Sequence, residues 1–106
     1  MKSEHQIQNE IRLALANHNC LVFRTNVGKV QMKDGRWFDT GLPRGFSDLM
    51  GARLSDGKIF FIEVKNKNGR VREDQVKFIN SMKSYGLIAG IARSVEDAIK
   101  IVGEEE

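Results

Sequence analysis

The stretch from Gly45 to Lys65, GFSDLMGARLSDGKIFFIEVK, decides the fold. Residues 59–65 are rich in β-branched and aromatic side chains, which predicts a strongly β-forming strand. Residues 46–54 predict a second strand, and the Asp56-Gly57 pair between them is typical of a two-residue hairpin turn. We therefore expect an antiparallel pair of strands here.

Three charged residues lie on these two strands, which otherwise resemble core. Alternation along residues 59–65 places Glu63 and Lys65 on one face. A two-residue turn would pair Asp48 with Lys65 and Met50 with Glu63, and directly paired residues share a face. We therefore expect the side chains of Asp48, Glu63 and Lys65 to project together.

The burial of these charges needs compensation, and two explanations can supply it. The first is a structural salt bridge between Lys65 and either acid. The second is a Mg²⁺ or Mn²⁺ ion, which prefers oxygen ligands and is anchored by one or two carboxylates. Such an ion polarises a phosphodiester and lowers the pKa of a bound water, while Lys65 would orient or deprotonate that water or neutralise the transition state. The residues alone leave both explanations open.

The rest of the chain predicts an α/β fold in one domain over residues 1–106. Its further expected elements are a helix at 3–17 capped by Ser3, a strand at 20–24, a hairpin with strands 30–33 and 36–38 around a two-residue Asp34-Gly35 turn, a helix at 73–85, a strand at 87–92 and a helix at 94–102. The helix between the 59–65 and 87–92 strands implies a right-handed crossover. The order α-β-β-β-α-β-α, with an extra hairpin excursion, gives a small mixed sheet flanked by helices on both faces.

Two helices carry a polar residue in the first turn that points toward the expected core. Glu4 falls near the middle of the apolar stripe of its helix and Glu10 falls toward the edge, although Glu4 as a plain partner of the helix dipole is the alternative. The inward residues of the 73–85 helix are expected to be Val76, Phe78, Ile79 and Met82. Gln75 shares that face, with a capping role as the alternative.

Composition and charge narrow the class of partner. The 106 residues carry a net charge of +3, and the acids Glu104 to Glu106 are expected to form a frayed tail, so the remaining chain is more basic and suits a polyanion. The lone Cys20 allows no intrachain disulfide. Because the sequence has no signal-peptide pattern and no run long enough to cross a membrane, we expect no membrane partner and a cytoplasmic location.

Residues 25–44 are polar, aromatic and basic, and they suggest an excursion from the core that touches a ligand. Trp37 and Phe38 would either stack on a base or fill a gap under the loop. A second basic segment, residues 66–72, follows Lys65.

The ordered set of motifs resembles the VRR-NUC domain of the PD-(D/E)xK nuclease superfamily, in its small stand-alone form found in phages and bacteria. The matching stretches are Ser3 to Ile7, Arg24 to Gly28, Gly41 to Asp48, Phe61 to Lys65, Gly69-Arg70, Gln75 and Gly90 to Ser94. They cover nearly the whole chain in the right order. Ser47 departs from the pattern, because the superfamily motif usually has proline at that position.

The resemblance implies a restriction-endonuclease-like core and a role for each matching residue. Asp48, Glu63 and the main-chain carbonyl of Val64 would be ligands of Mg²⁺ or Mn²⁺, and Lys65 would be the catalytic lysine. Glu4 matches the acid of the first helix that contributes to the metal site, and Gln75 matches a glutamine after the lysine strand. Contacts to DNA are expected from Arg24, Asn26, Lys29, Arg44, Lys67, Arg70 and Arg72.

Stand-alone members of the family resemble Holliday-junction resolvases, act as homodimers and cleave branched DNA. The leading hypothesis is therefore a metal-dependent, structure-selective DNA endonuclease in a bacterial or phage-infected cell. A non-catalytic nucleic-acid-binding module with the same fold is the second hypothesis, and it predicts salt-sensitive binding without metal dependence. A phage or mobile-element accessory protein that binds a protein partner through residues 25–44 is the third.

Overall fold

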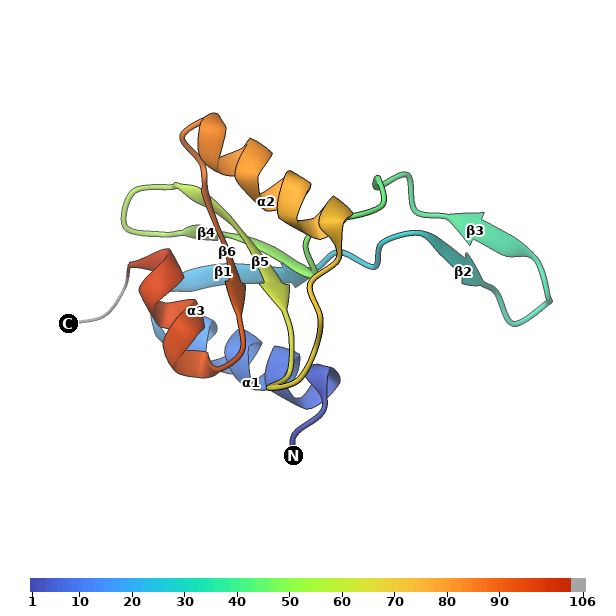
Figure 1. The fold of residues 1–106 in the computed structure, drawn as a ribbon, viewed down its shortest axis with the longest axis horizontal. Coiled ribbons are helices and arrows are strands. Elements are labelled where there is room, and N and C mark those ends of the chain that lie inside the picture. Colours follow the sequence, from blue (N-terminus) through green and yellow to red (C-terminus); the bar gives the residue numbers. More distant parts are fainter. Residues whose placement is uncertain (104–106) are drawn as a thin grey trace.

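The computed structural model describes residues 1–103, so the predicted acidic tail lies outside the described residues. Its elements in chain order are α1 (Glu4–Asn17), β1 (Cys20–Arg24), β2 (Lys29–Gln31), β3 (Trp37–Asp39), β4 (Leu49–Arg53), β5 (Ile59–Val64), α2 (Glu73–Ser84), β6 (Ile88–Ala92) and α3 (Val95–Val102). A four-stranded sheet has the order β1-β4-β5-β6, and β2 and β3 form a separate two-stranded sheet (Figure 1). The predicted α/β order with an extra hairpin is confirmed.

Helices cover both faces of the main sheet (Figure 1). On one face, α1 and α3 pack against Phe60, Ile62 and Val64 of β5. On the other face, α2 contributes Ile79 and Phe78, and the Phe46 and Phe78 rings lie 4.6 Å apart. This second face is the one toward which odd-numbered residues of β5 point.

The predicted inward face of α2 is partly wrong, because Val76 is 39 % exposed. Ile79 is buried, and Phe78 and Met82 pack against the same cluster, as expected. The helix ends at Ser84, one residue before the predicted boundary, and Tyr85 serves as its C-cap. None of the helices in residues 1–103 has the length and apolar character needed to cross a membrane.

The register of β4 against β5 differs by two residues from the prediction. Met50 pairs with Phe61 and Leu49 with Ile62, which brings Asp48 opposite Glu63 instead of Lys65. The strand also begins at Leu49, three residues after the predicted start. Because side chains in a strand alternate with a period of two, a two-residue shift changes partners and leaves every side chain on its predicted face.

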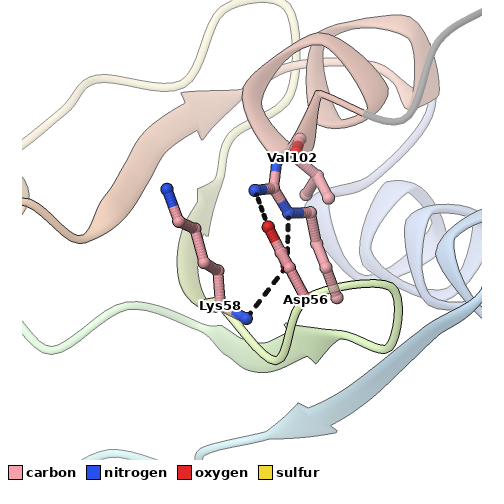
Figure 2. A network of polar contacts seen from close by, with 4 residues as sticks. Asp56, Lys58 and Val102 are labelled. Carbon is pink, nitrogen blue, oxygen red and sulfur yellow. Dashed lines mark hydrogen bonds and ion pairs between the residues drawn. The ribbon is translucent and has the colours of Figure 1, made fainter.

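A polar network at the end of the β4–β5 hairpin explains the longer turn. The Arg53 N–H donates to the Lys58 carbonyl at 2.9 Å, so residues 54–57 form the loop in place of two residues. Figure 2 shows Asp56, Lys58 and Val102 gathered at this loop. The Asp56 carboxylate accepts from the Arg53 guanidinium and from the Lys58 N–H, and Arg53 Nη1 also donates to the Val102 carbonyl at 2.8 Å. The hydrogen bond from Arg53 holds the pKa of Asp56 below its usual value.

The β2–β3 hairpin also has a longer loop than predicted. Gln31 pairs with Trp37, and the Met32 N–H donates to the Arg36 carbonyl at 2.6 Å, which leaves residues 33–35 in the loop. Gly35 adopts a φ of +88°, the left-handed conformation that closes a three-residue hairpin loop. The Asp34-Gly35 signal therefore located the turn correctly and gave the wrong loop length.

Gly51 in β4 lies too close to its neighbours to accept a side chain. A Cβ atom at this position would lie 2.0 Å from the Leu21 carbonyl oxygen and 2.6 Å from the Phe60 ring. We expect Gly51→Ala to lower the free energy of unfolding by about 2 kcal/mol, because β1 or Phe60 must shift. Urea denaturation measures the difference.

Gly57→Ala is the matched control for that substitution. Gly57 has open space around its Cβ position but a φ of +74°, so alanine there suffers backbone strain alone, worth about 1 kcal/mol. Equal losses in the two variants would contradict the steric account of Gly51.

Candidate active site

Two carboxyl groups meet at the carboxyl end of β5. Glu63 is 1 % exposed and shares a side-chain hydrogen bond with Asp48, which lies just before β4. Asp48 Oδ2 also accepts the N–H of Val64 at 2.9 Å, which fixes the aspartate against the end of the strand. The corrected register therefore places the two predicted acids in direct contact.

This contact changes the protonation of Glu63. Burial raises its pKa to about 9, with further contributions from the hydrogen bond to Asp48 and from the charge of Asp48. The positive charges of Lys65 and Arg72 lower the pKa without offsetting the other effects. Two carboxylates in contact repel each other, so ionising both is energetically unfavourable. Glu63 therefore holds its proton at neutral pH while no cation is bound.

One oxygen of this pair has no partner. Within residues 1–103, Glu63 Oε2 is buried and accepts no hydrogen bond. Buried acceptors in folded proteins are almost always satisfied, so an unpartnered carboxyl oxygen beside a second carboxylate suits a cation. Asp48 and Glu63 offer the hard oxygen ligands that Mg²⁺ and Mn²⁺ prefer, with the predicted Val64 carbonyl beside them. The residues present therefore fit a divalent metal ion.

Glu4 does not join these acids in the structure. Residues 1–103 contain no group of three or more His, Cys, Asp or Glu side chains that could hold a metal. The reason is that α1 packs on the opposite face of the sheet from α2, whereas Glu63 points toward α2. Glu4 instead reaches the loop after β5, where a Cβ at Gly69 would lie 2.7 Å from its Oε2, and Glu10 forms a salt bridge with Lys2. Glu4 as a metal contributor stays a prediction.

Lys65 lies directly after β5 and is 7 % exposed. Its N–H donates to the Ala92 carbonyl at 3.0 Å, which continues the parallel β5–β6 pairing by one residue. In the described part of the chain no salt bridge joins Lys65 to Asp48 or Glu63. The salt bridge that was one of the two explanations for these charges therefore does not form. The positive charge of Lys65 instead acts on Glu63 without a salt bridge, by lowering the pKa of its carboxyl group.

Gln75 takes the capping role that was the alternative for it. It is 6 % exposed, and its Oε1 accepts the N–H of Arg72 at 2.9 Å, which satisfies a donor at the start of α2. This bond fixes where α2 begins and holds the end of the basic loop against it. A direct catalytic role for Gln75 stays a prediction.

Hydrogen bonds replace the expected proline beside Asp48. Ser47 is 1 % exposed, and its Oγ donates to the Leu49 carbonyl at 2.9 Å. Thr25 Oγ1 donates to the Ser47 carbonyl at 2.5 Å, and the Thr25 N–H donates to the Asp48 carbonyl at 3.1 Å. These contacts fix the backbone that a proline would otherwise restrict. The positioning role of Thr25 was missed, because it depends on a contact between residues far apart in the sequence.

The seven predicted DNA contacts all lie on the surface. Arg24, Asn26, Lys29, Arg44, Lys67, Arg70 and Arg72 are exposed. Arg44 and Arg72 converge on Asp74 at 3.2 and 3.1 Å, although their segments are far apart in the sequence. Burial acts to raise the pKa of Asp74, but the hydrogen bond and charge of Arg72 and the charge of Arg44 outweigh it and lower the pKa. Two arginines are thereby held close together at the start of α2.

The basic loop after Lys65 is held in place by a residue that the sequence reading did not single out. Arg93 Nη1 donates to the carbonyls of Asn66 at 2.7 Å and Gly69 at 2.9 Å. Arg93 follows β6, which lies beside β5, so one guanidinium shapes the loop that carries Lys67 and Arg70. The one signal for Arg93 in the sequence is that it lies within Gly90 to Ser94, one of the stretches that resemble the family.

We expect Arg93→Ala to speed amide hydrogen exchange in residues 66–70 by about tenfold, because charge-assisted hydrogen bonds to the loop are lost. Hydrogen exchange followed by mass spectrometry measures the effect. Arg70→Ala, which removes an exposed arginine from the same loop, is the control and should leave exchange near the wild-type rate. Unchanged exchange in Arg93→Ala would show that the loop is held by other contacts.

A small mixed sheet between helices, with contacting carboxyl groups and a buried lysine at the end of an internal strand, is the arrangement of a nuclease-type domain. The chain belongs to the VRR-NUC domain family, whose sequence profile matches residues 2–96. A solved structure described as "VRR_NUC domain" has the same fold, with a TM-score of 0.68, 20 % sequence identity and full coverage of both chains. Among curated proteins, none matches the sequence. The family predicted from the ordered motifs is confirmed.

Proposed function

We propose that this protein is a Mg²⁺- or Mn²⁺-dependent endonuclease that hydrolyses phosphodiester bonds in branched DNA such as Holliday junctions. The observation that carries the proposal is the buried Glu63 carboxyl, in contact with Asp48 and with one oxygen unpartnered. Membership of a nuclease-type family supports the same conclusion. The organisation of the site suits hydrolysis better than simple binding, because a binding surface has no need for a buried carboxyl group in contact with a second one.

The chain's own residues would share the chemistry. A bound divalent cation supplies Lewis-acid polarisation of the phosphate and a water of lowered pKa. Asp48, Glu63 and the Val64 carbonyl would hold that cation, and Glu63 would release its proton when the cation binds. Lys65, buried beside the acids, would orient the attacking water or stabilise the charge that develops on the phosphate.

The exposed basic residues would hold the DNA backbone beside this site. Lys67 and Arg70 extend from the loop after Lys65, and Arg44 and Arg72 meet at the start of α2. Each phosphate contact adds affinity without adding sequence preference. Binding that depends on the DNA backbone and on shape agrees with a structure-selective enzyme.

The test is a cleavage panel of a four-way junction, a flap and a plain duplex with Mg²⁺ or Mn²⁺. Wild-type protein should cut branched DNA, while Asp48→Ala and Glu63→Ala should not. Glu10→Ala is the matched control, because this helix acid pairs with Lys2 away from the site. Equal activity in wild type and both site variants would point to a contaminating nuclease and would overturn the proposal. Salt-sensitive binding with no cleavage would favour a non-catalytic module.

We also propose that the protein acts as a homodimer in the cytoplasm of a bacterial or phage-infected cell. One small site cuts one strand, whereas a junction with two-fold symmetry presents two strands to be cut. Sedimentation at micromolar concentration, with and without junction DNA, checks the oligomeric state. A monomer under both conditions would count against the dimer.

A further inference from the structure

The β2–β3 hairpin projects from the body of the molecule as an arm (Figure 1). This arm, residues 26–45, leaves the body after β1 and returns before β4, and its two strands form a sheet of their own. Isolated two-stranded hairpins are only marginally stable in water. Contacts with other molecules or with the body of the protein therefore stabilise the conformation of such an arm more than its own strand pairing does.

Both ends of the arm are anchored to the body of the protein, one beside Asp48 and the other on α2. At the outgoing end, Thr25 donates to the carbonyls of Ser47 and Asp48. At the returning end, Gly45 packs so closely on α2 that a Cβ would lie 2.6 Å from the Asp74 carbonyl oxygen. The base of the arm therefore lies next to Asp48, while its hairpin projects away from the body (Figure 1).

The arm exposes aromatic side chains on both of its faces. Trp37 is 64 % exposed and Phe38 is 58 % exposed. Because neighbouring residues of a strand point to opposite faces, no single flat surface can cover both rings. The arrangement instead suits insertion into a ligand that lies on both sides of the hairpin. The alternative weighed from the sequence, in which the rings fill a gap under the loop, does not fit this exposure.

Basic residues accompany these rings. The segment from Arg24 to Arg44 contains five basic and two acidic residues, and Lys29 and Lys33 are exposed on the hairpin. Exposed aromatic rings among basic side chains are the combination that stacks on bases and follows a phosphate backbone. A two-stranded β-ribbon is also narrow enough to enter a DNA groove.

We infer that the arm recognises a discontinuity in DNA, with Trp37 and Phe38 stacking on bases that a branch point leaves unstacked. In an intact duplex the faces of the bases are already covered by their neighbours, and opening a base step costs free energy. At a branch point the faces are accessible, so the arm distinguishes shape instead of sequence. The inference rests on the proposed function only in that DNA held by the arm would also reach Asp48 and Glu63 beside the base of the arm.

Trp37 is the only tryptophan in the chain, so its fluorescence reports directly on the arm. The full-length protein is titrated with a four-way junction and with a blunt duplex of equal length, in buffer without divalent metal so that no cleavage occurs. We expect the junction to quench the emission strongly and the duplex to change it little. Equal quenching by both DNAs, or none by either, would overturn the inference.

A binding comparison tests the same point without fluorescence. Trp37→Ala combined with Phe38→Ala should weaken binding to the junction about tenfold or more and leave binding to the duplex near wild type. Tyr85→Ala removes an exposed ring that lies just after α2, outside the arm, and should bind both DNAs like wild type. Unchanged junction affinity in the double variant would overturn the inference. Trp37 emission that depends on protein concentration without DNA would also overturn it, because it would identify a second copy of the protein as the molecule that covers the arm.

These readouts separate the arm from the chemistry. Suppose that the junction quenches Trp37 and that the double variant binds it more weakly, but that the wild-type protein cuts no DNA. This result would support DNA recognition by the arm and overturn the proposed function. Metal-dependent cleavage with no contribution from Trp37 or Phe38 to DNA binding would support the proposed function and overturn DNA recognition by the arm. Circular dichroism of each variant confirms that the body of the protein is folded, because the arm lies outside both hydrophobic clusters.

Discussion

Replacing Glu63 by glutamine is expected to lower the rate of junction cleavage by at least roughly 1,000-fold. Glutamine nearly preserves the size and shape of the side chain and its ability to bond Asp48, so the fold is kept. It removes the negative charge that a divalent cation needs at the unpartnered Oε2 position. Single-turnover cleavage with saturating enzyme and Mn²⁺ measures the chemical step.

The control for this loss is Glu10→Gln, which changes an acid on α1 that pairs with Lys2. Asp48→Asn should behave like Glu63→Gln, and the double variant should be hardly worse than either, because residues that act as one unit are not additive. A Glu63→Gln enzyme that retains more than a tenth of the wild-type rate would mean that Glu63 is no metal ligand.

The same residue should make the metal-free protein less stable as the pH rises. In the unfolded chain the pKa of Glu63 lies near the ordinary glutamate value of 4.5, whereas its pKa in the folded protein is about 9. Between these values the folded state binds a proton that the unfolded state has lost, so the free energy of unfolding falls with rising pH. We expect a fall on the order of 5 kcal/mol between pH 5 and pH 9 from this group.

Urea denaturation in the presence of a chelator, at pH 5, 7 and 9, checks this slope. Glu63→Gln should flatten the slope and should be more stable than wild type at pH 9, because its side chain cannot ionise. Adding Mn²⁺ at pH 8 should raise the Tm of wild type and leave that of Glu63→Gln nearly unchanged. A wild-type stability that is independent of pH and of metal would show that Glu63 is not a buried acid held in its protonated form.

The shared face of Asp48, Glu63 and Lys65 could be predicted from the sequence even though the hairpin register could not. Alternation alone sets the face, and a shift of two residues leaves it intact. The register depended on the Asp56 side chain, whose hydrogen bonds to Arg53 and Lys58 stabilise a longer loop than the Asp56-Gly57 pair suggests. A local turn signal locates a turn more reliably than it gives the number of residues in it.

Contacts between distant segments account for what the sequence did not reveal. Thr25 holds the backbone of Asp48, and Arg93 holds the loop after Lys65, yet neither role has a local pattern. Helical phasing placed Glu4 on the inward stripe of its helix, but phasing cannot tell which of the two sheet faces a helix covers. The structure places α1 on the face away from Glu63.

The close approach of the two ends of the arm makes it an exchangeable module. Thr25 and Asp48 are already joined by a backbone hydrogen bond, so the β1–β4 pair is closed without any help from residues 26–45. The length and side chains of the arm are therefore free to diverge while the geometry of the acids stays constant. Replacement of this single insertion can therefore produce nucleases that share one active site and differ in the DNA structure they prefer.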